Sequence, residues 1–254
     1  MTDDSVWQPL HEALERWNDA GRVADFWLRD DDAVEPTPAL DRLLDLTGRY
    51  EVPVTLAVVP AFTGEALAAR LARAEHALVV VHGWAHENHA PGNEKKQELG
   101  THRPRVIVLD ELARGLAVIT QLHGGRAWPL LVPPWNRIDA GLIPDLGRLG
   151  FKALSVFGRP KRAPIRLINS NVDVMDWHGT RGCRDHALLI QEIIVQLKRA
   201  FAGGDPVGLL THHLVHDEAV WLFMQRLFEV TSRHGVRWLS SRAMPAQQSC
   251  ISGG

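Results

Sequence analysis

The segment Phe26-Trp27-Leu28-Arg29-Asp30-Asp31-Asp32-Ala33 brings three consecutive carboxylates to the end of a short apolar run. Like charges held this close repel one another, and ordinary strands contain few aspartates. A cation bound at this point would explain the arrangement. We therefore expect a strand over residues 23–28 that ends at a cation site.

A second segment places two histidines in the same position relative to a strand. A run of three valines leads into His82, and His86 follows four residues later. Two imidazoles with this spacing can meet one ion, and together with a carboxylate they suit a divalent metal with an open coordination position. The HExxH motif of zinc proteases has the same spacing but requires glutamate after the first histidine, where this chain has Gly83.

Apolar runs alternate with helical patterns along the 254 residues. This alternation predicts an α/β fold with a mainly parallel sheet, and the length suits one barrel domain over residues 1–254 with its core at about 23–240. Polar clusters directly follow several predicted strands, which is where such barrels carry their chemistry. The polar stretch from 86 to 105 has no clear period and predicts a long loop.

Charge and composition disfavour several classes of partner. The formal net charge of −2 gives no reason to expect nucleic acid or an anionic membrane. The first residues lack the features of a signal peptide, and no stretch approaches the roughly 18 apolar residues of a membrane span. Cys183 and Cys250 fit neither a disulfide framework nor a zinc pattern. We therefore expect a protein of the reduced cytoplasm.

Three further segments carry candidate chemistry. In residues 132–136, two prolines stiffen a turn that can aim backbone N–H groups at a developing oxyanion. Residues 173–177 hold two aspartates and a tryptophan, and residues 209–213 end a strand in two histidines. A histidine at a strand end, oriented by an aspartate from elsewhere, is a good general acid. Each segment also has a purely structural interpretation as a turn or a packing site.

Taken in chain order, the five segments resemble the motifs of the polysaccharide deacetylase family, the NodB-homology group or carbohydrate esterase family 4. That family's motifs are TFDDG, H-S/T-x-x-H, R-x-P-Y, D-x-x-D-W and L-x-L-H. They match residues 29–33, 82–86, 132–135, 173–177 and 210–212. The resemblance spans residues 23–215 and implies a distorted (β/α) barrel of about seven strands, with the NodB-like glycoside hydrolase/deacetylase fold.

The resemblance also implies roles for the matched residues. The metal ligands would be Asp32, His82 and His86, with zinc favoured and cobalt, nickel, manganese or iron as alternatives. The catalytic residues would be Asp31 as base, the Trp135 N–H as oxyanion contact, His212 as general acid and Asp176 as the orienting partner of His212.

Two of these assignments have rivals in the sequence. A shift of one residue would make Asp30 the base and Asp31 the ligand, and His213 competes with His212 for the role of acid. Substrate contacts are expected from the other polar and apolar residues of these segments: Asp30, Arg29, His89, Pro134, Asn136, Arg137, Trp177 and His213.

The chain departs from the family pattern in the third motif. Val132 occupies the place of the arginine that pairs with the base, Trp135 replaces tyrosine and Asn136 replaces glycine. Arg29 lies two residues before Asp31 and therefore on the same face of the strand. Either Arg29 or Arg137 could supply the missing guanidinium.

The resemblance implies a metal-dependent hydrolase that removes an N-acetyl or related amide or ester group from a small saccharide or oligosaccharide. Nine tryptophans against one tyrosine suit apolar platforms for sugar rings. One alternative is a hydrolase of a non-sugar C–N bond, such as that of a cyclic amide. Another is a catalytically silent carbohydrate-binding protein, which the missing arginine favours.

Overall fold

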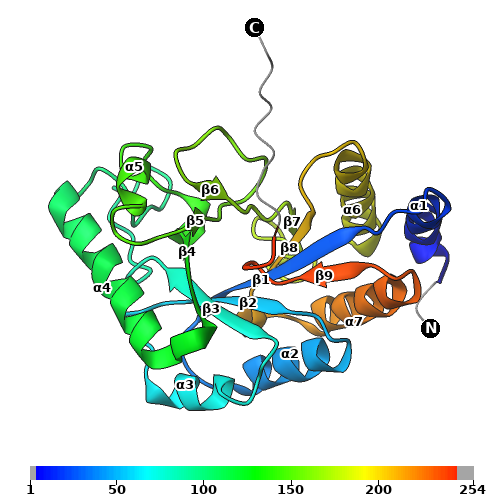
Figure 1. The fold of residues 1–254 in the computed structure, drawn as a ribbon, viewed down its shortest axis with the longest axis horizontal. Coiled ribbons are helices and arrows are strands. Elements are labelled where there is room, and N and C mark those ends of the chain that lie inside the picture. The colour runs from blue at the N-terminus through cyan, green and yellow to red at the C-terminus, as the bar shows by residue number, and fades with distance from the viewer. Residues whose placement is uncertain (1–3, 245–254) are drawn as a thin grey trace, which may run out of the picture.

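Parallel strands form one curved sheet in the computed structural model, which describes residues 4–244 (Figure 1). The strand order is β6-β5-β4-β3-β2-β1-β8-β7, and β9 also pairs with β1. The strands are β1 (Asp25–Ala33), β2 (Val54–Val58), β3 (Ala77–His82), β4 (Ala127–Val132), β5 (Ala153–Leu154), β6 (Arg166–Leu167), β7 (Val172–Asp173), β8 (Val207–Thr211) and β9 (Arg237–Leu239). The predicted distorted (β/α) barrel is therefore confirmed. The sheet has nine strands rather than about seven, and three of the nine are only two residues long.

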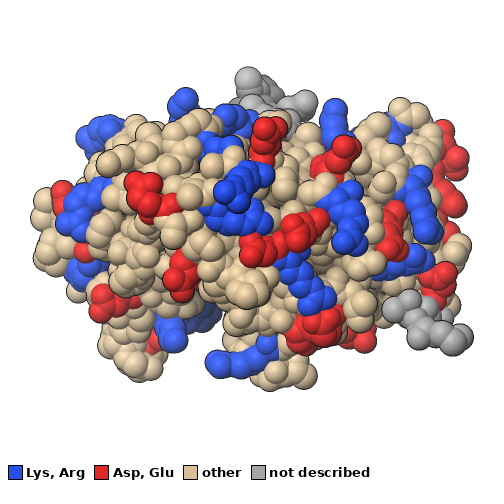
Figure 2. All heavy atoms as spheres, turned by 90° about the horizontal axis from the view of Figure 1, so that it is seen from below, with Lys and Arg blue, Asp and Glu red and all other residues tan. Residues whose placement is uncertain are grey.

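Helices cover the outside of this sheet. In Figure 1, α4 lies on the left, where it packs against β3 and β4, α1 and α6 lie on the right, and α2, α3 and α7 lie below. The helices are α1 (Gln8–Asp19), α2 (Pro38–Arg49), α3 (Glu65–Leu71), α4 (Arg105–His123), α5 (Ile143–Leu146), α6 (His186–Phe201) and α7 (Glu218–Arg233). Acidic and basic residues lie side by side on the lower face (Figure 2). No helix in residues 4–244 is both long and apolar enough to cross a membrane.

Strand β1 separates the two parts of the core. Phe26 and Leu28 belong to the large apolar cluster under the helices, whereas Trp27 belongs to a smaller cluster inside the barrel. This follows from the alternation of side chains along a strand. The indole of Trp27 lies so close to β8 that a Cβ at Gly208 would come within 2.4 Å of its Nε1. Glycine at this position therefore gives Trp27 the room to fill the barrel.

Strand β1 also continues further than the sequence predicts. It includes all three aspartates rather than ending before them, but its register against β2 shifts between Asp30 and Ala33. Within the shift, Asp32 has a φ of 73°, which few residues other than glycine adopt. Regular alternation would give Asp32 the same direction as Asp30, and the irregularity removes that constraint.

Two other expectations have different outcomes. The stretch from 86 to 105 is irregular up to the start of α4, as predicted. The residue pattern over 138–149 predicts a helix, but this prediction is wrong, because only α5 is helical there. The Asp139 side chain accepts a hydrogen bond from the Gly141 N–H at 2.9 Å, which is a local alternative to helix. Cys250 lies outside the described residues.

Candidate active site

The ends of β1 and β3 bring Asp32, His82 and His86 together. Their candidate ligand atoms all lie within 4.8 Å of one another. Asp32 Oδ1 is 2.9 Å from His82 Nε2 and 3.2 Å from His86 Nε2. The structure thus assembles the three residues that the sequence predicts as metal ligands.

The surroundings of His82 suit a metal ligand. Its Nδ1 lies 2.9 Å from the Val132 carbonyl oxygen, which can only accept, so Nδ1 carries the proton in the neutral ring and Nε2 keeps its lone pair. Burial alone would raise the pKa of Asp32, but the hydrogen bond and charge of His82, with the charges of His212 and His86, lower it. Asp32 is therefore an anion, and one carboxylate with two imidazoles is a donor set that zinc accepts.

The pKa of His82 is raised, whereas that of Asp32 is lowered. Burial would lower the pKa of this imidazole, but its hydrogen bond to Asp32 and the charges of Asp31 and Asp32 raise it. Burial and the charge of His82 lower the pKa of His86. Protons therefore compete with a metal for His82 in particular.

Glu98 holds the loop between the two histidines, a role that the sequence does not reveal. Its buried carboxylate accepts hydrogen bonds from the N–H groups of Ala85, at 2.7 Å, and Trp84, at 3.2 Å. Gly83 has a φ of 59°, and a Cβ there would lie 1.9 Å from Glu98 Oε2. This packing explains why the loop contains glycine where the family motif has serine or threonine.

Asp31 is paired with Arg29 from its own strand. Arg29 Nε lies 3.0 Å from Asp31 Oδ1, and Nη2 donates to Oδ2 at 3.1 Å. The guanidinium also donates to Ser155 Oγ at 2.8 Å and to Asn136 Oδ1 at 2.6 Å. Arg29 therefore supplies the guanidinium that Val132 cannot. Since Arg29 is fully buried, the expectation that it contacts substrate is corrected.

Asp30 and His213 form a second buried pair. The Asp30 carboxylate contacts His213 Nδ1, and it also accepts from the His213 N–H at 2.9 Å and from Thr211 Oγ1 at 2.7 Å. Burial opposes both charges, but the attraction between them wins, so the pKa of His213 is raised and that of Asp30 is lowered. The expectation that Asp30 and His213 contact substrate is corrected, because both side chains are enclosed.

His212, unlike the enclosed His213, lies near Asp31. Its Nε2 lies 4.0 Å from Asp31 Oδ2, and its ring packs edge-on against Trp177, with 4.7 Å between ring centroids. The His212 N–H donates to His216 Nε2 at 3.2 Å. Burial lowers the pKa of His216 to about 4, so this acceptor is neutral near pH 7. Between the two rival histidines, the geometry favours His212 as the acid.

Asp176 does not reach His212. Its carboxylate accepts from the N–H groups of Gly179, at 3.0 Å, and Thr180, at 2.9 Å, and so closes an exposed turn. Asp173, at the end of β7, accepts from Trp177 Nε1 at 2.9 Å. Burial raises the pKa of Asp173, whereas the charge of His212 lowers it, so the two groups interact. Neither aspartate orients His212 directly, because His212 Nδ1 has no hydrogen-bond partner among residues 4–244, although Asp173 holds the Trp177 indole that packs against the His212 ring.

The turn after β4 packs against the metal cluster. Trp135 has a φ of 53°, and its indole lies 4.4 Å from the His86 ring. Pro134 lies beside Gly83, where a Cβ would come within 2.7 Å of it. Arg137 Nη1 donates to the Lys96 carbonyl at 2.8 Å instead of reaching Asp31.

His89 is half-buried, and its N–H donates to the Gln97 carbonyl at 3.1 Å. This bond lies within the loop that follows His86. The structure therefore shows His89 as part of that loop, and its contact with substrate stays a prediction.

Solved structures share this architecture at low sequence identity. A protein from Mycobacterium smegmatis described as a polysaccharide deacetylase has a TM-score of 0.66 and 16% identity, over 87% of this chain and 88% of that one. A chitin deacetylase from Colletotrichum lindemuthianum has a TM-score of 0.59 and 18% identity, over 91% and 95%. The peptidoglycan deacetylase PdaC from Bacillus subtilis has a TM-score of 0.56 and 17% identity, over 87% and 89%.

The chain has the polysaccharide deacetylase fold. No family model matches the sequence, and no curated protein matches it. The identities of 16–18% are low, so these likenesses show a shared fold. The guanidinium that pairs with Asp31 comes from β1 rather than from the segment that follows β4.

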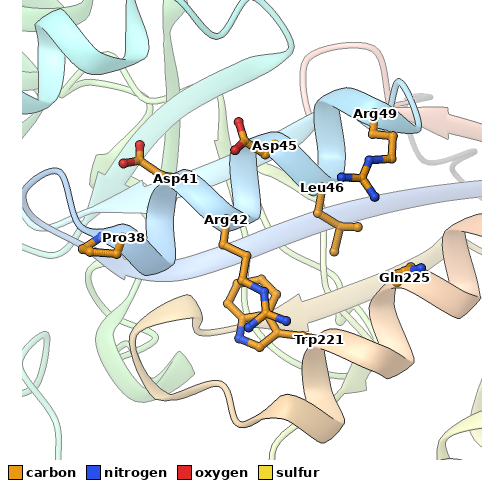
Figure 3. Close-up of a pocket in the computed structure, with 8 residues that line it drawn as sticks. All are labelled: Pro38, Asp41, Arg42, Asp45, Leu46, Arg49, Trp221 and Gln225. Atoms are coloured by element: carbon orange, nitrogen blue, oxygen red, sulfur yellow. The ribbon is translucent and has the colours of Figure 1, made fainter.

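A groove of about 510 Å³ between α2 and α7 lies apart from this deacetylase-like site (Figure 3). The lining residues are Pro38, Asp41, Arg42, Asp45, Leu46, Arg49, Trp221 and Gln225. Arg42 donates to Glu218 at 2.8 Å and stacks over Trp221, so its charge is already paired. The groove contains none of the metal-cluster residues and gives no reason to move the site away from the strand ends.

Proposed function

We propose that the chain is a metal-dependent deacetylase that hydrolyses an N-acetyl or related amide or ester group on a saccharide. The observation that carries the proposal is the arrangement of three groups at one edge of the barrel. The Asp32–His82–His86 cluster lies beside the Asp31–Arg29 pair, and His212 lies across from Asp31. Zinc is the favoured metal, and a small saccharide in the cytoplasm is the proposed substrate and location.

The donor set fits a divalent cation held by Asp32, His82 and His86. When bound, such an ion polarises the acyl carbonyl and makes a water more acidic. Asp31 takes the proton from the attacking water, and Arg29 orients the Asp31 carboxylate. The Trp135 N–H is the proposed donor to the developing oxyanion. As the C–N bond breaks, His212 gives its proton to the leaving amine, and the acyl group departs as a carboxylate.

The silent-protein alternative rested on the missing arginine, and Arg29 now occupies that role. The cyclic-amide alternative keeps the same site and differs only in substrate. A screen of acetylated sugars against cyclic amides with metal-loaded protein separates these two, because acetate release from sugars alone supports deacetylation.

Variants of these residues test whether Asp32 and His82 bind the metal and whether Asp31 acts as the base. We expect Asp32→Ala and His82→Ala to lose bound metal, measured by elemental analysis after dialysis. Asp31→Asn should keep the metal but lose roughly 10²–10⁴ in the rate of acetate release. Full metal occupancy in Asp32→Ala would overturn the ligand assignment.

A further inference from the structure

Two cations stand at the edge of the metal cluster. The Lys96 ammonium lies 5.9 Å from the centroid of the Trp135 ring, and the same ring lies 4.4 Å from the His86 ring. Arg137 is in contact with the Lys96 carbonyl. One indole therefore separates a candidate metal ligand from an exposed ammonium group.

The backbone around Lys96 is held in place. Its carbonyl accepts from Arg137 Nη1 at 2.8 Å, and the N–H of the next residue, Gln97, donates to Asn88 Oδ1 at 2.9 Å. The Gln97 carbonyl accepts from the His89 N–H at 3.1 Å. A lysine on such a fixed segment loses less freedom on binding than one on a loose loop.

Acidic side chains of this loop form no ion pair with Lys96. Glu94 pairs with His102 at 3.0 Å, Glu98 turns inward to the backbone amides that follow Gly83, and Glu87 is exposed and forms no ion pair with a described residue. Within residues 4–244, neither Lys96 nor Arg137 forms an ion pair with a carboxylate. Both charges are therefore available to a ligand.

Positive charge continues on the neighbouring strand end. β5 lies next to β4, and the segment after it, residues 157–166, contains four basic and no acidic residues. Arg159, Lys161 and Arg162 are exposed there and have no ion pair with any described residue. The chain as a whole is slightly acidic, and the face in Figure 2 is mixed. The segment that follows β5 therefore adds exposed cations next to the end of β4.

We propose that the saccharide substrate carries an anionic group, a phosphate or a carboxylate, which Lys96 and Arg137 bind while the acyl group lies at the metal cluster. This inference rests on the proposed function and specifies its substrate class. Charge-assisted hydrogen bonds from ammonium and guanidinium groups are the usual way in which proteins bind such anions. Arg159, Lys161 and Arg162 would attract the substrate at longer range.

The test compares matched probes on the metal-loaded full chain. The probes are N-acetylglucosamine, its 1-phosphate and its 6-phosphate, and the corresponding uronic acid. We expect at least one anionic probe to have a kcat/KM roughly tenfold or more above that of the neutral sugar, a preference that falls as salt is added. A higher kcat/KM for a sugar phosphate would identify the anionic group as a phosphate, and a higher kcat/KM for the uronic acid would identify it as a carboxylate.

Lys96→Ala should reduce the anionic-to-neutral ratio of kcat/KM about tenfold, chiefly through KM. Lys95→Ala is the matched control, because it removes the same charge from an adjacent exposed residue that has no contact with Trp135. Equal kcat/KM for neutral and anionic probes, or equal effects of the two lysine variants, would overturn the inference.

Binding keeps this test separate from that of the proposed function. If no probe is hydrolysed, the proposed function fails, and calorimetric titration of wild-type protein and Lys96→Ala with the same probes still decides the inference. Preferential binding of an anionic probe that depends on Lys96 supports it. Equal or absent binding of all probes contradicts it.

Discussion

Asp30, Asp31 and Asp32 are adjacent in the chain, but each carboxylate has its own partner. Asp30 pairs with His213, Asp31 with Arg29, and Asp32 with the two candidate metal ligands. The repulsion that makes the sequence unusual is relieved three times rather than once by a single cation. The sequence indicated the cation site and Arg29 as one possible partner. It could not reveal the Asp30 pair, which depends on how β8 packs beside β1.

The Arg29–Asp31 pair gives the first prediction at this scale. Arg29→Lys keeps a positive charge but loses the forked contact and leaves Ser155 and Asn136 without their donor. We expect kcat to fall roughly 10- to 100-fold, while the metal Kd changes little, because the ligands are untouched. Steady-state kinetics and calorimetric metal titration measure the two quantities. Ser155→Ala is the control, because it removes one Arg29 partner and leaves the Asp31 pair intact; loss of metal binding in Arg29→Lys would contradict the prediction.

Glu98 gives the second prediction. Glu98→Gln replaces one of the two acceptor oxygens with an N–H₂ group that faces a backbone N–H, so the loop between His82 and His86 should loosen. We expect the metal Kd to rise roughly 10- to 100-fold, measured by competition with a chelator. Glu87→Gln, on the exposed part of the same loop, should leave the Kd unchanged. An unchanged metal Kd in Glu98→Gln would show that Glu98 does not position the loop between His82 and His86.

Elements were predictable where their pattern is long and local. The sequence predicts strands at 52–59 and 77–81 and helices at 38–50 and 217–234, and the structure has β2, β3, α2 and α7 at these places. The sequence also predicts short strands at 153–157 and 167–169, which the structure has as the two-residue strands β5 and β6. Strand β7 was not predicted, because two residues are too few for a pattern and the strand forms by pairing with β8. The end of β1 was misjudged because aspartates are poor strand residues, and tertiary pairing outweighs that preference.

His123, in the last turn of α4, gives a prediction of pH dependence. Burial, with a smaller effect from the charge of Arg126, lowers the pKa of this imidazole to about 4 from its usual 6.5. His123 therefore binds a proton more readily in the unfolded chain than in the folded one. Neutral His123 makes its full contribution to stability above pH 6.5, and this contribution is lost as the pH falls toward 4. At pH 5 the loss amounts to about 1–2 kcal/mol.

Scanning calorimetry of metal-free protein at pH 7 and pH 5 tests whether His123 causes this loss of stability. The drop in Tm from pH 7 to pH 5 should be smaller in His123→Gln than in wild type. His178→Gln is the matched control, because His178 is exposed. The same drop in His123→Gln and wild type would show that His123 does not cause the acid sensitivity.

In the whole molecule, the order of strands in the sheet brings together site residues that are far apart in the sequence. Arg29 and Ser155 are 126 positions apart, and Asp30 and His213 are 183 apart, yet both pairs are in contact. Parallel pairing of β1 with β2 and β8 places the ends of these strands at one edge. The sequence predicted that edge from recurring polar clusters, but not which clusters would meet. Asp176, for example, was assigned from its place in the motif, but the structure places its carboxylate in an exposed turn.

Because β1 and β3 both contribute ligands, a bound metal should stabilise the whole barrel. At a free zinc concentration 100 times the Kd, the expected gain is about 2.7 kcal/mol, or roughly 5–10 °C in Tm for a chain of this size. Thermal scans with zinc and with a chelator measure it. Asp32→Ala should show no zinc-dependent shift, and a shift of equal size there would place the metal elsewhere.

The origin of Arg29 and Asp31 on one strand has an evolutionary consequence. A base and counter-ion drawn from two strands change their spacing whenever those strands slip or a loop between them is resized. Here the two partners lie two residues apart on β1, so their spacing is fixed by one strand, and only Asn136 and Ser155, which hold the Arg29 guanidinium, tie the pair to other elements. Mutations that resize the loops of the barrel can therefore leave the Arg29–Asp31 pair intact as long as Asn136 and Ser155 keep their places.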